Sequence, residues 1–277
     1  MSEIDEATKK PCIALMGEFS AGKSTLANLL IGSQPLPVQV VASHVPPVMV
    51  SYGAGAPFRV DTDGNEHPID LCHIAAAPLD ETVFIQIYCE EAVLKRCNLL
   101  DMPGISDPNM SPQVWQRMIA QADGVLWCSH ATQAWRQSEA AVWASLPDTL
   151  YANSLFLLTR IDKVTNEKDR EKIVGRVRSE TENLFRACLP ISLLQAANEE
   201  NDYEAWLRTG AGDFAHHFKA LLRDLDPVAE VEEPVRPDAA RAVLCASVDA
   251  KSEEPTRPIT PRRVEGMRAV TPRPRRD

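Results

Sequence analysis

A glycine-rich segment near the N-terminus contains the residue types that hold phosphate. Residues 17–24 fit the pattern Gly-x-x-x-x-Gly-Lys-Ser, in which successive backbone N–H groups turn inward around phosphate oxygens at the start of a helix. Lys23 would neutralise the β- and γ-phosphates, and the Ser24 hydroxyl would bind Mg²⁺. A glycine turn closed by a surface lysine is the alternative, but an apolar strand before the segment and a helix after it favour a nucleotide site. The residues expected on the nucleotide here are Gly17, Glu18, Phe19, Ser20, Ala21, Gly22, Lys23, Ser24 and Thr25.

A second phosphate-sensing segment is predicted where Asp101-Met102-Pro103-Gly104 follows an apolar run. A carboxylate there can hold Mg²⁺ through water, and the Gly104 N–H can turn toward the γ-phosphate. Taken alone, Asp-x-Pro-Gly is most often only a turn, but its place after a phosphate loop favours the functional interpretation. Ser43 is the candidate for a hydroxyl that reaches Mg²⁺, with an ordinary serine in a Pro-rich loop as the alternative. We therefore expect Mg²⁺ on Ser24, Ser43 and Asp101, and the chemistry at the γ-phosphate near Lys23, Ser20, Ser43 and Gly104.

A third segment, Thr159-Arg160-Ile161-Asp162, is the candidate for base recognition. The Asp162 carboxylate can accept hydrogen bonds from N1–H and the 2-amino group of guanine, whereas adenine presents neither donor. The stem of Arg160 could lie along the base or sugar, Thr159 could fix the loop, and backbone N–H groups of residues 192–196 could touch the base edge. Arg136 has two interpretations, an internal arginine finger or a surface or interface ion-pair residue.

The elements that must position these segments alternate between apolar strands and amphipathic helices. This order predicts an α/β fold of three layers, with a mostly parallel central sheet and helices on both faces. A hairpin is expected at 58–62 and 66–69, and the strands at 83–88 and 97–100 are expected to pair antiparallel because their link is short. The other expected strands are 12–16, one ending near Gly53, 124–128, 154–158 and 188–192. Helices are expected at 25–31, from Pro112, up to Leu146, from Asn166 to about Ala187, and at 202–207 and 213–225.

Length and composition bound the domain organisation. The 277 residues, 44% of them hydrophobic, suffice for one sizeable core, which we place at 11–226. Seven scattered cysteines without zinc spacing indicate a reducing compartment, and we expect a cytoplasmic protein because no apolar run approaches the roughly 18 residues of a membrane span. The net charge of −10 argues against general nucleic-acid binding.

Residues 227–277 are rich in Pro, Glu and Arg and lack aromatics, so a disordered tail is predicted. Its last part is basic, with arginines at 257, 262, 263, 268, 273, 275 and 276. Three interpretations stay open: a solubilising end, an arm for an acidic protein partner, and an anchor on an anionic membrane.

Together, residues 17–25, 101–104 and 159–162 resemble the GTPase domain of the dynamin superfamily, especially its bacterial members. The resemblance covers about residues 11–226 and implies a P-loop GTPase fold that binds GTP or GDP with Mg²⁺. It also implies dimerisation across the nucleotide face. Three residues depart from the pattern: Ser43 stands where Thr is usual, Phe19 where classical dynamins carry a water-orienting Gln, and Ile105 where Ras-like proteins carry their catalytic Gln. Many bacterial relatives share the Phe.

Two function hypotheses remain from different classes. The first is a GTP-binding switch of dynamin type that hydrolyses GTP slowly and acts through partners, at or away from a membrane surface. The second is a non-catalytic nucleotide-binding scaffold, in which Phe19 and Ile105 mark lost chemistry. An ATP-dependent enzyme is disfavoured because Asp162 suits guanine.

Overall fold

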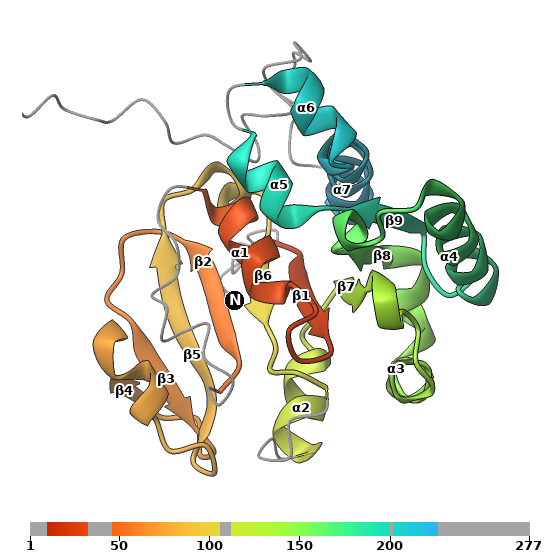
Figure 1. Ribbon diagram of the computed structural model, residues 1–277. Helices are drawn as coiled ribbons and strands as arrows, with labels where there is room; N and C mark the ends of the chain where they lie inside the picture. The colour runs from red at the N-terminus through yellow and green to blue at the C-terminus, as the bar shows by residue number, and fades with distance from the viewer. Residues whose placement is uncertain (1–9, 33–45, 106–111, 200–201, 227–277) are drawn as a thin grey trace, which may run out of the picture. The chain divides into compact units, whose positions relative to one another are not determined.

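A mixed sheet of nine strands organises the residues that the structure describes. The computed structural model describes residues 10–32, 46–105, 112–199 and 202–226, which all belong to one compact unit (Figure 1). The strand order is β4-β3-β5-β2-β6-β1-β7-β8-β9. Ser43 and the tail at 227–277 lie outside the described residues, so the predictions on them stay predictions.

Five neighbouring strands are parallel and carry the predicted motifs at their carboxyl ends. They are β6 (Asn98–Asp101), β1 (Cys12–Gly17), β7 (Gly124–His130), β8 (Ser154–Thr159) and β9 (Ala187–Ile191). Asp101 lies opposite Leu15 on β1, and Gly17 lies opposite Cys128 on β7. Ligands of open α/β sheets bind beyond the carboxyl ends of such strands. The sheet therefore brings the phosphate loop, the Asp101 segment and the Asp162 segment to one edge.

The remaining strands form the mixed side of the sheet, and they are β2 (Val48–Tyr52), β3 (Phe58–Asp61), β4 (Glu66–Pro68) and β5 (Thr82–Cys89). The predicted hairpin is confirmed, with β3 and β4 antiparallel. The predicted pairing of β5 with β6 is wrong, because β2 lies between them. β2 pairs parallel with β5 and antiparallel with β6, and its residues Val48, Met49 and Val50 are buried. The short link is therefore compatible with β5 and β6 running in opposite directions, but it does not require the two strands to be neighbours in the sheet.

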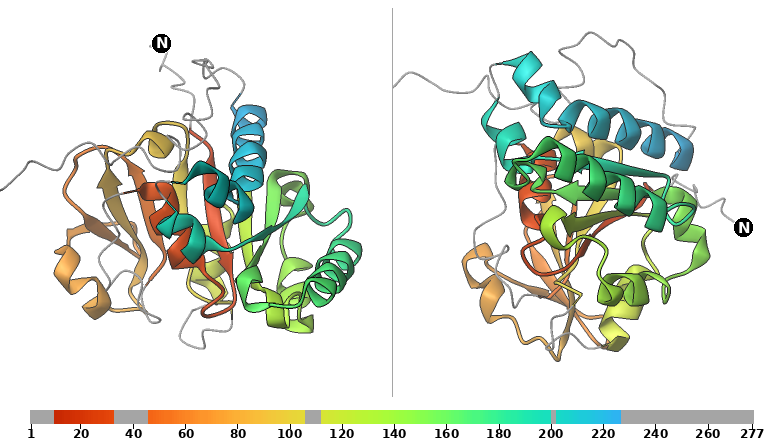
Figure 2. Two further views of the ribbon diagram at one scale, coloured as in Figure 1. Left: turned by 45° about the horizontal axis from the view of Figure 1, so that its top comes forward. Right: turned by 45° about the vertical axis from the view of Figure 1, so that its right-hand side comes forward.

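Helices cover both faces of the sheet (Figures 1 and 2). Along β1, Ile13 and Leu15 face one core, whereas Cys12, Ala14 and Met16 face the other. The first core packs against α1 (Lys23–Ile31), α5 (Leu193–Asn198), α6 (Tyr203–Arg208) and α7 (Ala211–Leu225). The second packs against α2 (Pro112–Ile119), α3 (Gln137–Trp143) and α4 (Glu167–Glu180). The three-layer prediction is confirmed. Successive side chains of the buried strands point to opposite faces of the sheet, and because both faces are apolar, each is covered by helices.

Two helices end earlier than predicted. α4 begins after Asn166, whose side chain accepts a hydrogen bond from the Asp169 N–H, but it ends at Glu180 instead of near Ala187. The Thr181 hydroxyl donates to the Val177 carbonyl, and Asn183 adopts a left-handed φ of 65°, so the chain turns toward β9. α3 ends at Trp143 instead of Leu146, because the Ser145 and Leu146 amides donate three residues back, as in a 3-10 turn.

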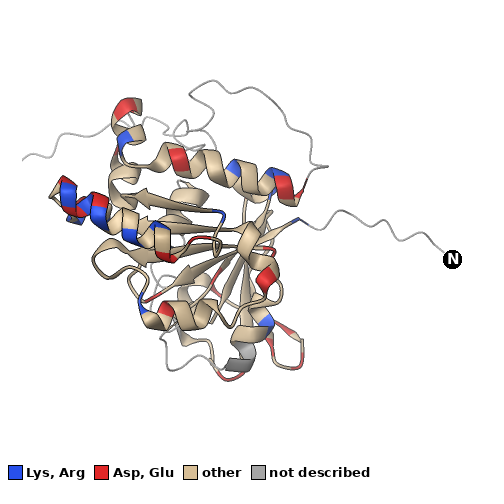
Figure 3. Ribbon diagram, turned by 90° about the vertical axis from the view of Figure 1, so that its right-hand side faces the viewer, with Lys and Arg blue, Asp and Glu red and all other residues tan. Residues whose placement is uncertain are grey.

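The surface of α4 carries charges of both signs (Figure 3). Arg176 pairs with Glu180 at 2.7 Å, and Lys172 lies 3.7 Å from Asp169. Exposed pairs of this kind contribute little to stability, so they indicate a solvated face. Among the described residues, no helix is long and apolar enough to cross a membrane.

Candidate functional site

The phosphate loop joins β1 to α1, and its shape requires two glycines. Gly17 has a φ of 136°, and a Cβ on it would lie 2.0 Å from the Cys128 carbonyl oxygen. Gly22, directly before α1, has a φ of 100°. Both angles lie in the region that favours glycine. The tight contact with β7 and the left-handed turn at Gly22 therefore fix where the loop leaves the sheet and where the helix starts.

Lys23 closes the loop from the first turn of α1. Its ammonium donates to the carbonyl oxygens of Gly17, at 2.9 Å, and Glu18, at 2.8 Å. Burial lowers the pKa of Lys23, and the charge of Asp101 opposes that shift. A buried ammonium held against the loop in this way is placed to neutralise phosphate.

The segment after β6 lies against the phosphate loop. A Cβ on Gly104 would lie 3.1 Å from the Phe19 nitrogen, and the Ile105 N–H donates to the Gly17 carbonyl at 3.2 Å. Burial raises the pKa of Asp101 to about 6, against the opposing charge of Lys23. Asp101 and Ser24 supply a carboxylate and a hydroxyl oxygen, which are donors that Mg²⁺ prefers. A cation would also relieve the cost of ionising the Asp101 carboxyl, so these residues fit a magnesium site.

The candidate base loop is tied to the phosphate loop. The buried Thr159 hydroxyl donates to the Ala21 carbonyl at 2.6 Å, which agrees with the prediction that Thr159 fixes the loop. Asp162 accepts a hydrogen bond from the Ser192 hydroxyl at 2.7 Å, and Lys163 lies 3.5 Å from its other oxygen. Arg160 adopts a left-handed φ of 53°, and its guanidinium lies 3.4 Å from His130 Nε2. The Asp162 carboxylate is thus held in one orientation at the sheet edge.

The backbone at 192–196 fits its predicted role only in part. The Ser192 N–H donates to the Thr209 carbonyl, and the Ala196 N–H donates to the Ser192 carbonyl. These two amides are used within the protein and do not fit a contact with a base. The Ser192 side chain, in contrast, supports Asp162 directly.

A pocket of about 290 Å³ lies beside the phosphate loop, and Arg136 is the residue outside the loop that the sequence had already indicated there. Its other wall is formed by the exit of β7 and by α3, through His130, Gln133, Arg136 and Glu139. The Ser138 hydroxyl donates to the Glu18 carboxylate at 3.0 Å, so α3 is also tied to the loop. Arg136 therefore lies beside the phosphate loop.

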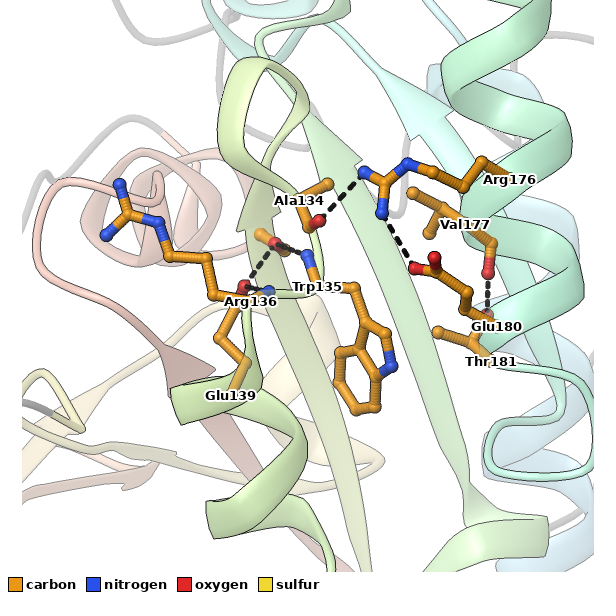
Figure 4. Close-up of polar contacts among 9 residues, drawn as sticks. Ala134, Trp135, Arg136, Glu139, Arg176, Val177, Glu180 and Thr181 are labelled. Atoms are coloured by element: carbon orange, nitrogen blue, oxygen red, sulfur yellow. Dashed lines mark hydrogen bonds and ion pairs between the residues drawn. The ribbon is translucent and has the colours of Figure 1, made fainter.

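Glu139 is the main residue that sequence reasoning missed. It is 1% exposed and accepts hydrogen bonds from Trp127 Nε1 at 3.1 Å and the Ser129 hydroxyl at 3.0 Å. It also accepts from the Arg136 N–H at 3.0 Å (Figure 4). Burial raises the pKa of Glu139, and these hydrogen bonds oppose the shift. Glu139 stands three residues after the helix cap, which is the spacing of a capping box. Because the cap residue is Arg136 and not Ser, Thr, Asp or Asn, the pattern was not recognisable.

Comparisons with known proteins agree with this geometry. Residues 13–161 match the model of the Dynamin family. The chain is similar to Dynamin-like protein 2 of Campylobacter jejuni subsp. jejuni serotype O:23/36 (strain 81-176), with 26% identity over 196 residues, 68% of this chain and 32% of that protein. The chain thus spans about a third of the length of this curated relative.

A solved structure shares the fold. It is described as an oligomerised bacterial dynamin pair that provides a mechanism for the long-range sensing and tethering of membranes. The TM-score is 0.53 with 21% identity, and the match covers 79% of this chain and 34% of that chain.

The substitution Glu139→Gln tests the buried carboxyl. At pH 5 we expect the variant to be less stable than the parent by about 1–3 kcal/mol, because one buried donor loses its acceptor. The raised pKa means that Glu139 in the folded parent keeps its proton at pH values above 4.5, where the unfolded chain has lost it. The free energy of unfolding of the parent therefore falls as the pH rises. Gln cannot ionise, so in urea unfolding the stability deficit of the variant should narrow as the pH rises from 4.5 through the raised pKa of Glu139. A deficit that widened would contradict this, and Glu182→Gln at an exposed site is the matched control.

Proposed function

The chain belongs to the dynamin family, and from that premise we propose that it binds GTP with Mg²⁺ and hydrolyses it slowly to GDP and phosphate. The observation that carries the proposal is that two segments distant in sequence, those of Gly104 and Thr159, contact the phosphate loop. Lys23 lies in the loop, Gly104 packs on Phe19, and Thr159 donates to Ala21. Such a convergence at the carboxyl ends of parallel strands is what phosphoryl transfer needs for positioning.

The phosphates would be held by the backbone of residues 17–25 and by the Lys23 ammonium. Mg²⁺, when bound, would neutralise charge on the β- and γ-phosphates, and Ser24, Asp101 and the undescribed Ser43 would hold it. The Gly104 N–H would contact the γ-phosphate, and the packing of Gly104 against Phe19 of the phosphate loop supports this. Ser20, with a left-handed φ of 59°, would lie beside the same phosphate.

Guanine would be selected by Asp162. Its carboxylate is held by Ser192 at the same sheet edge, and Thr159 and Arg160 precede it in sequence. A fixed carboxylate accepts from N1–H and the 2-amino group of guanine, and adenine lacks both donors. This supports GTP and GDP over ATP and ADP as ligands.

Slow turnover is proposed because no polar side chain occupies the two positions where a water-orienting Gln is usual. Phe19 is 66% exposed beside the phosphate loop, and Ile105 follows Gly104. We propose that GTP-dependent contact across the nucleotide face makes the chain an assembly switch. In the proposed contact, the exposed Phe19 ring would pack against a second copy or a related chain.

A nucleotide-binding scaffold without turnover is the second candidate, and the same Phe19 and Ile105 favour it. The activity of a longer protein is not implied, since the chain spans only part of its relatives. Peripheral membrane contact of a cytoplasmic protein, or capture of an acidic partner, would depend on residues 255–277, and it stays a prediction from their arginines.

The substitution Lys23→Ala should weaken GTP binding by about 10- to 100-fold, because a hydrogen bond to a charged group contributes about 1.5–3 kcal/mol. Calorimetry measures the affinity, and circular dichroism checks that the fold is kept. Lys172→Ala, on the exposed surface of α4, should bind GTP like the parent. Parent-like affinity in Lys23→Ala would remove the phosphate loop from the proposed site.

The substitution Asp162→Asn should weaken GTP by about 10- to 100-fold while sparing xanthosine triphosphate, whose 2-oxo group matches an amide donor. Competition against a fluorescent GTP measures both affinities, and ATP should compete poorly with the parent. Asp169→Asn on exposed α4 is the matched control. Unchanged GTP affinity in Asp162→Asn would exclude Asp162 from base recognition.

Turnover per molecule should be slow in dilute protein and should rise with protein concentration if contact across the nucleotide face completes the site. Phosphate release measured over a range of protein concentrations tests this. Fast turnover that did not depend on concentration would contradict the assembly proposal, and absent turnover with intact GTP binding would favour the scaffold.

A further inference from the structure

The segment between β7 and α3 is built with more restraints than an ordinary surface turn. Trp135 adopts a left-handed φ of 55°, which is uncommon for a bulky residue. Its N–H donates to the Ser129 hydroxyl at 3.2 Å, and the Ala134 carbonyl accepts from Arg176 at 3.0 Å (Figure 4). Backbone strain of this kind persists where the surroundings over-determine it, and it gathers at functional sites.

The ring of Trp135 is also fixed. It packs edge-on against Phe156 and Phe185, with ring centroids 5.6 Å away in both cases. The aromatic core on this face of the sheet thus holds the residue directly before Arg136. The backbone of Arg136 is then fixed by Glu139, which accepts its N–H at 3.0 Å.

The Arg136 side chain, in contrast, is exposed and lines the pocket beside the phosphate loop. Figure 4 shows it extending to the opposite side of the segment from Arg176. Its guanidinium donates to the Gln133 side-chain oxygen, which is a neutral group, and among the described residues it forms no ion pair, although the acidic residues Glu18 and Glu139 line the same pocket. The pocket wall facing it includes Phe19 and Ser20 of the phosphate loop.

A positive charge at this place has a use in the reaction. When water oxygen bonds to the γ-phosphorus, the bond to the β–γ bridging oxygen breaks and its electron pair stays on GDP. The proton of the water ends on the released phosphate. Negative charge therefore shifts onto the bridging and γ-phosphoryl oxygens, where a guanidinium can stabilise it by donating hydrogen bonds without giving up a proton.

We propose that Arg136 is a catalytic residue supplied by the chain itself, whose guanidinium contacts the phosphoryl oxygens of GTP across the pocket. Glu139 is its positioning residue, because the buried carboxylate accepts a hydrogen bond from the Arg136 N–H. The carboxylate also accepts from the Ser129 hydroxyl, which in turn accepts from the Trp135 N–H. The inference rests on the proposed GTP hydrolysis and deepens it, by naming the group that supplies positive charge where Phe19 and Ile105 supply no polar group. Of the two interpretations of Arg136 that the sequence left open, it adopts the internal arginine finger.

The first test compares Arg136→Gln with Arg178→Gln, which removes the same charge from the exposed face of α4. We expect Arg136→Gln to lower kcat at least about tenfold, with GTP affinity within about threefold of the parent. Capture of fluorescent GDP by aluminium fluoride, which mimics the transferring phosphoryl group, should also be lost. Arg178→Gln should match the parent in all three measurements.

The outcomes separate the two proposals. A parent that fails to bind guanine nucleotide would overturn the proposed function and this inference with it. A parent that binds GTP and an Arg136→Gln variant with parent-like turnover and capture would overturn the inference alone. Binding without turnover or capture in the parent would also overturn the inference, while leaving the scaffold function intact.

The second test asks whether Glu139 acts through Arg136. We expect Glu139→Gln to lower kcat more than it raises KM, and the double variant with Arg136→Gln to be no slower than Arg136→Gln alone. A purely structural role would instead make the two losses multiply. Losses that multiplied would remove Glu139 from the proposal.

Discussion

The close approach of β1 to β7 at Gly17 is the contact on which the site depends. The Cys128 carbonyl occupies the space where a side chain on Gly17 would lie, so the chain must turn there with a φ that only glycine adopts freely. The turn directs the phosphate loop along the sheet edge. The carbonyl oxygens of Gly17 and Glu18 can then accept hydrogen bonds from the Lys23 ammonium.

Buried charges are arranged around this turn, and each is held by named partners. Lys23 rests on two carbonyl oxygens, Asp101 lies within reach of the Lys23 charge, and Glu139 accepts three hydrogen bonds. In a low-dielectric region such groups interact strongly with a bound ion or phosphate. Burying these charged groups lowers the stability of the free protein. A charged ligand that bound beside them would offset this cost.

Hydrogen bonds connect the phosphate loop to its neighbours. Thr159 ties it to β8, Ile105 joins it to the segment after β6, and Ser138 joins it to α3. A shift of the loop would disturb contacts on three sides. If the chain acts as the assembly switch that we propose, this coupling would transmit the state of the nucleotide to the surface around Phe19.

The sequence by itself determined the phosphate loop, the Asp101 and Asp162 segments, the three layers and the hairpin, because glycine spacing, strand-end carboxylates and apolar periodicity are local properties. It did not determine that β2 inserts between β5 and β6, since neighbours in a sheet are chosen by long-range packing and a short link fixes only direction. It also did not show the role of Glu139, which looks like any helical glutamate until Trp127 and Ser129, ten and more residues away, converge on it. Only the tertiary structure could place Arg136 at the phosphate loop, because that position depends on how β7, α3 and the aromatic core pack together.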